Sequence, residues 1–225
     1  MGVVVGGRLI VMRHGRTHAN ARAIFDTQLP GAELTVIGRE QAVAAGRRLG
    51  EVTGRLGCAV SSYAMRAQQT MMLAVAAFEG VQVEAISCGQ LRTPVSSVGG
   101  IHEIFAGDIE GSSSPSAHQV YMRAMRAWLS GDFSARMPGG ESAEEFLGRA
   151  VPTLRLLADA ATASNSDTLV VAHGAAIRLI GRFGTDVPDD VLRNTYVNNA
   201  SLTVIEPRGD FGQWHVSRWA DTPLD

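Results

Sequence analysis

The chain has 225 residues, of which 45% are hydrophobic and 19% are charged, enough apolar material for one sizeable core. Its 20 basic and 22 acidic residues leave a net charge of −2, which excludes a general electrostatic attraction to nucleic acid or to an anionic membrane. The two cysteines, Cys58 and Cys88, are too few for a disulfide framework and lack zinc-binding spacing, so we expect a cytoplasmic protein. We expect no signal peptide, because Arg8 interrupts the first apolar run and no cleavage pattern follows, and no stretch is long enough to span a bilayer.

Short apolar runs alternate along the chain with longer segments of helical periodicity. A strand is predicted at 9–12, followed by a short helix from about Thr17. A longer helix is predicted at 36–52, with Thr35 as its N-cap. The remaining predicted elements are, in chain order, a strand at 58–61, a helix at 64–78, strands at 81–86 and near Ile101, a strand at 168–173, a helix at 174–184, and strands at 201–206 and 213–219.

This alternation predicts the fold class. Strands that are apolar throughout and separated by helices form a mostly parallel sheet covered on both faces, a three-layer α/β/α fold. The last two strands flank the turn-like PRGDFG and predict an antiparallel hairpin at the edge. The region from about 104 to 140 breaks the rhythm, because a Ser-rich loop is followed by a helix with no strand behind it. We therefore expect one domain over residues 1–225, with a helical insertion at 104–140 over the carboxyl ends of the strands.

Charged and imidazole side chains stand where the predicted strands end. Ligands of an open parallel sheet bind beyond the carboxyl ends of its strands, so these side chains are expected to converge on one site. Five residues have this placement: Arg13, His14, Arg66, Glu103 and His173.

The chemistry that such a set supports is phosphoryl transfer. Guanidinium groups bind phosphate oxygens in a bidentate manner, and a neutral imidazole held in one tautomer is a nucleophile. A second imidazole can donate a hydrogen bond to the phosphoryl group, and a carboxylic acid can protonate the leaving alkoxide. We expect no cofactor and no metal, because arginine and histidine already balance the developing charge and no carboxylate cluster suits magnesium.

Five segments of the chain resemble the motifs of the histidine phosphatase superfamily, which includes the cofactor-dependent phosphoglycerate mutases. RHGRTHAN is similar to its RHGxTxxN, SSYAMRAQQT to its SSxxxRAxQT and HEIFAGDIEG to its REIxFGDWEG. PGGES is unchanged, and VVAHGAAIR is similar to VxHGxxIR. The segments occur in family order over nearly the whole chain, and the phosphatase branch is favoured because HEIFAG stands where the mutases resemble one another in an ERHYG-type segment.

The resemblance implies a role for each matching position. His14 would be the nucleophile that forms a phosphohistidine, with Glu103 as proton donor and His173 as a second imidazole facing the phosphate. The phosphate-binding residues that it implies are Arg13, Asn20, Arg66 and Gly174.

Four assignments stay open at this stage. Asp26 stands where many phosphatase relatives carry a glutamine, so either its carboxylate points away from the phosphate or Thr27 takes that role. Glu110 and Asp108 compete with Glu103 as proton donor, and Glu103 is favoured by motif register alone. The segment containing Glu141, Ser142 and Glu145 is either the capped start of a helix or faces the substrate. Arg123 and Arg126 either meet a second anionic group of the substrate or form a solvated helix face.

The first functional hypothesis is a metal-independent phosphomonoesterase acting on a small phosphorylated metabolite, with no nucleic-acid or membrane partner. The second is a mutase that returns the phosphoryl group to a substrate, and the third is a phosphate-binding protein without turnover. The resemblance also allows a homodimer.

Overall fold

The computed structural model describes residues 7–82 and 88–224. At its centre lies a seven-stranded sheet with the order β3-β2-β4-β1-β5-β6-β7. The pairs β3–β2, β2–β4 and β4–β1 are parallel, whereas β1–β5, β5–β6 and β6–β7 are antiparallel. The predicted mostly parallel sheet with an antiparallel edge is confirmed. The strands are β1 (Leu9–Arg13), β2 (Leu56–Ser62), β3 (Val95–Val98), β4 (Asp167–Ala172), β5 (Leu202–Glu206), β6 (His215–Trp219) and β7 (Thr222–Pro223).

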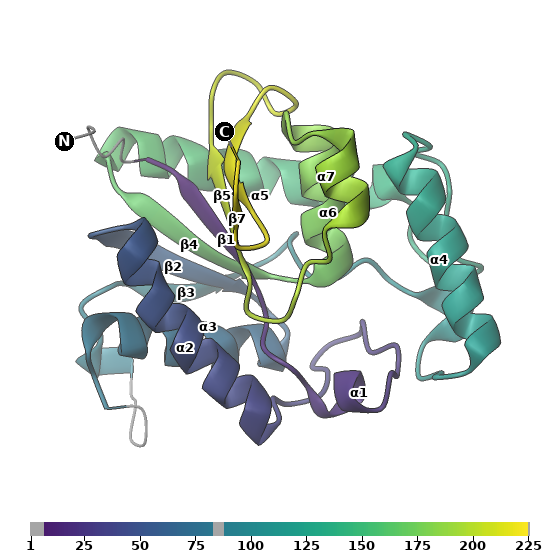
Figure 1. Ribbon diagram of the computed structural model, residues 1–225, viewed down its shortest axis with the longest axis horizontal. Coiled ribbons are helices and arrows are strands. Elements are labelled where there is room, and N and C mark those ends of the chain that lie inside the picture. Colours follow the sequence, from purple (N-terminus) through teal and green to yellow (C-terminus); the bar gives the residue numbers. More distant parts are fainter. Residues whose placement is uncertain (1–6, 83–87, 225) are drawn as a thin grey trace.

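Helices cover both faces of the sheet, as the apolar strands require. Successive side chains of a strand point to opposite faces. In β1, Ile10 and Met12 join the apolar cluster formed with α2 and α3, and Leu9 and Val11 join the cluster formed with α5 and α6. Figure 1 shows these two helical layers on either side of the strands. The helices are α1 (His18–Ala21), α2 (Val36–Val52), α3 (Met65–Glu79), α4 (Pro115–Leu129), α5 (Ala143–Ser164), α6 (Gly174–Gly184) and α7 (Asp189–Asn194).

Two predicted helix starts are capped by their own sequence. The Thr35 side chain accepts a hydrogen bond from the Gly38 N–H at the start of α2. Ser142 and Glu145 form a reciprocal capping box at the start of α5, so this part of PGGES begins a helix. The capping interpretation of Ser142 and Glu145 is thereby confirmed.

The strand at the edge of the sheet beside β2 is not the one that the sequence predicts. Most of the strand predicted at 81–86 lies outside the described residues, and the strand that pairs with β2 is β3, some ten residues further on. The predicted strand near Ile101 is wrong, because β3 ends at Val98 and Ile101 lies in the loop that follows. The short elements β7 and α7 were not predicted, since segments of two and six residues carry little periodicity.

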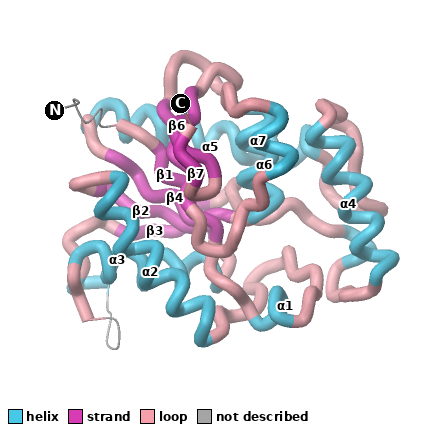
Figure 2. Tube along the Cα trace, in the orientation of Figure 1, coloured by secondary structure: helices cyan, strands magenta, loops and turns pink. Residues whose placement is uncertain are grey.

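The insertion forms α4, which packs beside α6 through a buried apolar stripe that includes Trp128 and Leu129. Figure 2 shows that the segments around α1, and those leading into α4, are mostly loop. These loops and α4 lie next to the carboxyl end of β1, the place where the sequence predicts a site. Among the described helices, none combines the length and the apolar character needed to cross a bilayer.

Candidate active site

His14 directly follows β1 and continues its pairing with β4, because the His14 N–H donates to the Ala172 carbonyl at 3.0 Å. The chain then turns at Gly15, where a Cβ atom would collide with the carbonyl oxygen of Gly38 in α2. The Gly15 N–H donates to Thr70 Oγ1 of α3 at 3.0 Å. The turn is therefore held on three sides, and the His14 ring is fixed in place with 4% of its surface exposed.

The hydrogen bonding of His14 determines its tautomer. Its Nδ1 lies 2.7 Å from the Gly15 carbonyl oxygen, which can only accept, so Nδ1 carries the proton. Burial, followed by the positive charges of Arg66 and Arg13, holds the pKa of His14 well below its ordinary value of 6.5. The imidazole is consequently neutral near pH 7, with its lone pair on Nε2. This is the state that a nucleophilic histidine requires.

Two guanidinium groups converge on the same cavity as His14. Arg13 Nη1 donates to the Val197 carbonyl at 2.6 Å and to the Tyr196 hydroxyl at 3.2 Å. Arg66 is 2% exposed. Among the described atoms, Arg13 Nε and Arg66 Nη1 are buried without a hydrogen-bond partner. Because an unpaired buried N–H is costly, these two donors indicate an anionic ligand.

Gly174 makes room for one of these guanidinium groups. A Cβ atom at Gly174 would lie 3.3 Å from both Cζ and Nε of Arg13, closer than nearly all real Cβ contacts. Gly174 itself is not part of the cavity wall. Its expected role as a phosphate-binding residue is therefore corrected to a steric one, which allows Arg13 to lie against the start of α6.

His173 lies behind Arg66 and is fully buried. Its Nδ1 accepts from Arg66 Nε at 3.3 Å, so the ring proton is on Nε2, which lies 2.7 Å from Ser62 Oγ. Burial and then Arg66 hold its pKa well below 6.5, and its ring centroid is 5.2 Å from that of His14. In this structure His173 orients Arg66 and does not line the cavity.

Glu103 lines the cavity from the loop after β3. Its carboxylate accepts from the N–H groups of Ala175 at 3.1 Å and Ala176 at 2.9 Å, in the first turn of α6. Glu110 instead accepts from the Thr27 N–H and hydroxyl, and the exposed Asp108 lies outside the cavity wall. Of these three candidate proton donors, Glu103 is the one that lines the cavity.

Asn20 lies on the cavity wall at the end of the RHGRTHAN segment. Its Oδ1 accepts from the Thr17 N–H at 3.1 Å and from Asn199 Nδ2 at 3.4 Å, which leaves its own Nδ2 to donate to a ligand. Asn199 Nδ2 also donates to the His14 carbonyl at 2.9 Å. Sequence reasoning missed Asn199, because it lies 185 residues from His14 and belongs to no recognisable motif.

The sequence left two alternatives for the segment after Asn20: Asp26 points away from the phosphate, or Thr27 takes the phosphate-binding role. The structure shows neither. Asp26 lines the cavity, where its Oδ2 accepts from the Ala32 N–H at 2.8 Å and lies 3.6 Å from Arg66 Nη1. It does not point away from the phosphate site. Thr27 also reaches the wall, but its hydroxyl donates to Glu110 Oε2 at 2.5 Å and accepts from the Ala106 N–H at 3.1 Å. Thr27 is thus used to hold the loop.

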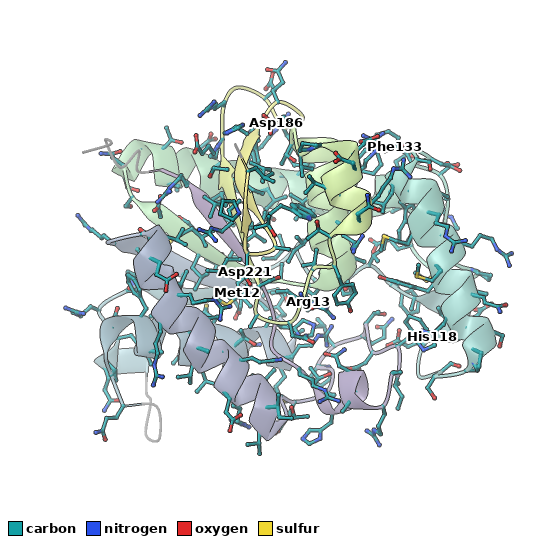
Figure 3. All side chains as sticks on the ribbon, viewed as in Figure 1. Met12, Arg13, His118, Phe133, Asp186 and Asp221 are labelled. Atoms are coloured by element: carbon teal, nitrogen blue, oxygen red, sulfur yellow. The ribbon has the colours of Figure 1, made fainter. Side chains whose placement is uncertain are left out.

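The cavity has a volume of about 430 Å³ and is bounded on its far side by α4. In Figure 3, Arg13 extends from the end of β1 and His118 from α4, the two elements that face each other across it. The predicted contact of Arg123 and Arg126 with a substrate is not supported. Both are exposed and lie outside the cavity wall, because the opposite face of α4 is needed for packing on α6.

Glu141 also takes no part in the cavity wall. Its carboxylate accepts from Arg149 Nε at 2.6 Å and from Arg149 Nη2 at 2.7 Å, so this glutamate is tied to α5 and does not face a substrate. Within the described part of the chain, no three His, Cys, Asp or Glu side chains are grouped so that they could hold a metal ion.

The sequence model of the histidine phosphatase superfamily (branch 1) matches residues 9–222. The chain belongs to this superfamily. The family prediction made from the five motif segments is thereby confirmed, and with it the expectation of a phosphatase-type enzyme.

The proteins that this chain resembles include both a phosphoglycerate mutase and phosphatases. A 2,3-bisphosphoglycerate-dependent phosphoglycerate mutase of Methylobacterium radiotolerans is 29% identical over 206 residues, 87% of this chain and 92% of the relative. The solved structure of a mycobacterial glucosyl-3-phosphoglycerate phosphatase in complex with VO3 is 26% identical and has a TM-score of 0.71, covering 94% of this chain and 98% of that one. The α-ribazole phosphatase of Shigella flexneri shares the fold, with a TM-score of 0.67, 24% identity and coverage of 97% and 98%.

Proposed function

We propose that the protein is a phosphomonoester hydrolase that works through a phosphohistidine on His14 and needs no metal ion. One observation carries this proposal. The neutral His14 presents its Nε2 lone pair at a cavity where Arg13 Nε and Arg66 Nη1 are buried without a hydrogen-bond partner. A phosphate group placed there would satisfy both donors while its phosphorus faces the nucleophile.

In the first step, Nε2 of His14 attacks the phosphorus atom and the bond between phosphorus and the ester oxygen breaks. Glu103 in its protonated form delivers a proton to the departing alkoxide, and Arg13, Arg66 and Asn20 stabilise the charge on the phosphoryl oxygens. In the second step, a water molecule attacks the phosphorus atom of the phosphohistidine and gives a proton to the Glu103 carboxylate, while the bond between phosphorus and His14 Nε2 breaks. Inorganic phosphate leaves, and His14 returns to its neutral form.

The competing candidate is a mutase, favoured by the 29% identity to a phosphoglycerate mutase. A mutase must return the phosphoryl group from the phosphohistidine to a monophosphate and hold the acidic bisphosphate that forms, which requires cations beyond the phosphate clamp. The Asp26 carboxylate lines this cavity beside Arg66. Its negative charge opposes a second acidic group, so hydrolysis is the better-supported outcome.

The test is phosphate release from p-nitrophenyl phosphate in the presence of a chelator. We expect turnover by the wild type and a loss of at least about a thousandfold in the His14→Ala variant, since the nucleophile is removed. Incubation with a ³²P-labelled ester followed by rapid denaturation should trap an acid-labile, alkali-stable phosphoprotein in the wild type alone.

His18→Ala is the matched control, because His18 is an exposed histidine in the same segment and is not part of the cavity wall. It should retain activity. An inert wild type, or a His14→Ala variant that keeps its activity, would contradict the proposal. Phosphoryl transfer that depends on a bisphosphate primer, with little release to water, would favour the mutase.

A further inference from the structure

Beyond the phosphate site, the cavity is lined by an apolar wall. Its members come from the loop after α1, from the loop after β3, and from the insertion. They are Ile24, Phe25, Ile104, Tyr121, Met122 and Met137. We refer to these six side chains as the apolar wall.

The apolar wall is fixed by contacts that do not involve a ligand. The Phe25 ring lies 5.2 Å from the Tyr121 ring and 4.8 Å from the His118 ring, centroid to centroid. The Phe25 N–H donates to the Ser112 carbonyl at 3.0 Å, and its carbonyl accepts from the Gly111 N–H at 2.8 Å. The loop that carries Phe25 is thereby attached to the start of the insertion, so the wall is preformed.

The basic side chains near the apolar wall either donate hydrogen bonds to backbone carbonyls or lie outside the cavity wall. His118 Nε2 lies 3.1 Å from the Ala23 carbonyl, which can only accept its proton. Arg178 donates to the carbonyls of Leu192 at 3.2 Å and Thr195 at 3.0 Å. Arg123 and Arg126 are exposed and line a neighbouring surface hollow that shares His118 and Met122 with the cavity, but neither arginine lines the cavity itself. Within the cavity wall, the apolar side chains are thus the groups that face the leaving alcohol.

The other charged side chains of the cavity also disfavour a substrate whose alcohol portion is acidic. Arg16 lines the cavity directly after the His14-Gly15 turn, so it adds to the positive charge at the phosphate site. The Asp26 carboxylate, which lies 3.6 Å from Arg66 Nη1, lines the cavity as well and repels other acidic groups. A substrate with a carboxylate or a second phosphate on its alcohol portion would bring like charges together next to an apolar surface.

We propose that the substrate class is phosphate monoesters whose alcohol portion is uncharged and apolar, either aryl or bulky alkyl. This inference rests on the proposed hydrolase function and specifies the leaving group that the site accepts. It replaces the expectation of an acidic metabolite bound through Arg123 and Arg126. Apolar contact with the six wall side chains would lower KM, and the Asp26 carboxylate would raise it for acidic esters.

The test compares benzyl phosphate with 4-carboxybenzyl phosphate, which share the same reacting atoms. We expect kcat/KM of the wild type to be at least about tenfold higher for benzyl phosphate, with most of the difference in KM. The variant Met122→Lys introduces a cation into the apolar wall at a partly exposed position, and it should reduce or reverse that preference. Met122→Leu is the matched control and should keep it.

Equal or better use of the carboxylated ester by the wild type, with activity that His14→Ala abolishes, would overturn this inference and leave the hydrolase proposal standing. Loss of the benzyl preference in Met122→Leu would also overturn it, because the charge at that position would then be irrelevant. Failure of both esters, together with failure of p-nitrophenyl phosphate, would overturn the hydrolase proposal itself.

Discussion

Asp26 places a carboxylate inside the cavity where we propose that a phosphate group binds. The side chain is 23% exposed and lies 3.6 Å from Arg66 Nη1, one of the two buried donors without a hydrogen bond. Asp26 therefore offsets part of the charge of Arg66 when no phosphate is bound. It also repels a phosphate dianion that approaches the same guanidinium group. We therefore infer that Asp26 weakens phosphate binding and favours release of the product in the proposed hydrolysis.

Replacing this carboxylate should strengthen the binding of inorganic phosphate. In Asp26→Asn the amide oxygen can still accept from the Ala32 N–H, whereas the negative charge is lost. We expect the inhibition constant of phosphate to fall by about threefold to tenfold, that is about 0.6–1.4 kcal/mol. Asp108→Asn, at an exposed carboxylate outside the cavity wall, should leave the constant unchanged. A higher inhibition constant in Asp26→Asn would disprove this role.

At the scale of elements, α5 positions the loop that carries Glu103, the proposed proton donor. The guanidinium of Arg149 donates to the carbonyls of Gly100 at 2.5 Å, His102 at 3.0 Å and Glu103 at 3.1 Å. The same group makes a bidentate pair with Glu141. Arg149 of α5 thus donates hydrogen bonds to three carbonyl groups of the loop. The N–H groups at the start of α6 donate to the Glu103 carboxylate. Arg149 is a positioning residue that acts through Glu103.

Lysine cannot reproduce the planar fork of arginine, so Arg149→Lys should misplace Glu103. We expect kcat to fall by about tenfold for benzyl phosphate, whose alkoxide needs a proton, and by much less for p-nitrophenyl phosphate, whose leaving group does not. Glu103→Gln should show the same dependence on leaving group, more strongly. Arg155→Lys, an exposed arginine of the same helix, serves as control. Equal losses for both esters would indicate general damage to the fold.

For the molecule as a whole, two buried histidines of the site make the free energy of unfolding depend on pH. His14 and His173 are both buried, and in both cases burial is the largest cause of a pKa held well below 6.5. In the unfolded chain these histidines regain ordinary pKa values. As the pH falls below about 6.5, the unfolded state binds protons that the folded state does not, so the free energy of unfolding decreases. Their stabilising contribution is present above that pH and is lost as the pH falls.

This loss can be measured by chemical denaturation between pH 7.5 and 5. Each of the two histidines should lower the free energy of unfolding by at most about 1.4 kcal/mol per pH unit below pH 6.5. His14→Asn, which removes one titrating group, should show a shallower pH dependence than the wild type. His18→Asn, at an exposed histidine, should match the wild type. A wild-type stability that is flat over this range would refute the neutral state of the two rings.

Much of the molecule was predictable from local pattern. The strand 9–12 and the strand before His173 were recognised as continuous apolar runs, the helix 36–52 by its periodicity and its Thr35 cap, and the helix 174–184 by its place after the strand. The convergence of Arg13, His14, Arg66 and Glu103 followed from the rule that parallel strands end at the same edge. The position of β3 was not predictable, since four residues that are half-buried or exposed do not form a distinctive run.

The sequence by itself determined the fold class, the family and the residues that can hold and attack a phosphate, because these depend on patterns within short segments. Only the tertiary structure decided which way side chains point. It placed Asp26 beside Arg66, brought Asn199 to His14, and directed Tyr121 into the cavity while Arg123 faces solvent. The direction of a helix face depends on what the helix packs against. For α4 that surface is α6, which lies more than forty residues further along the chain.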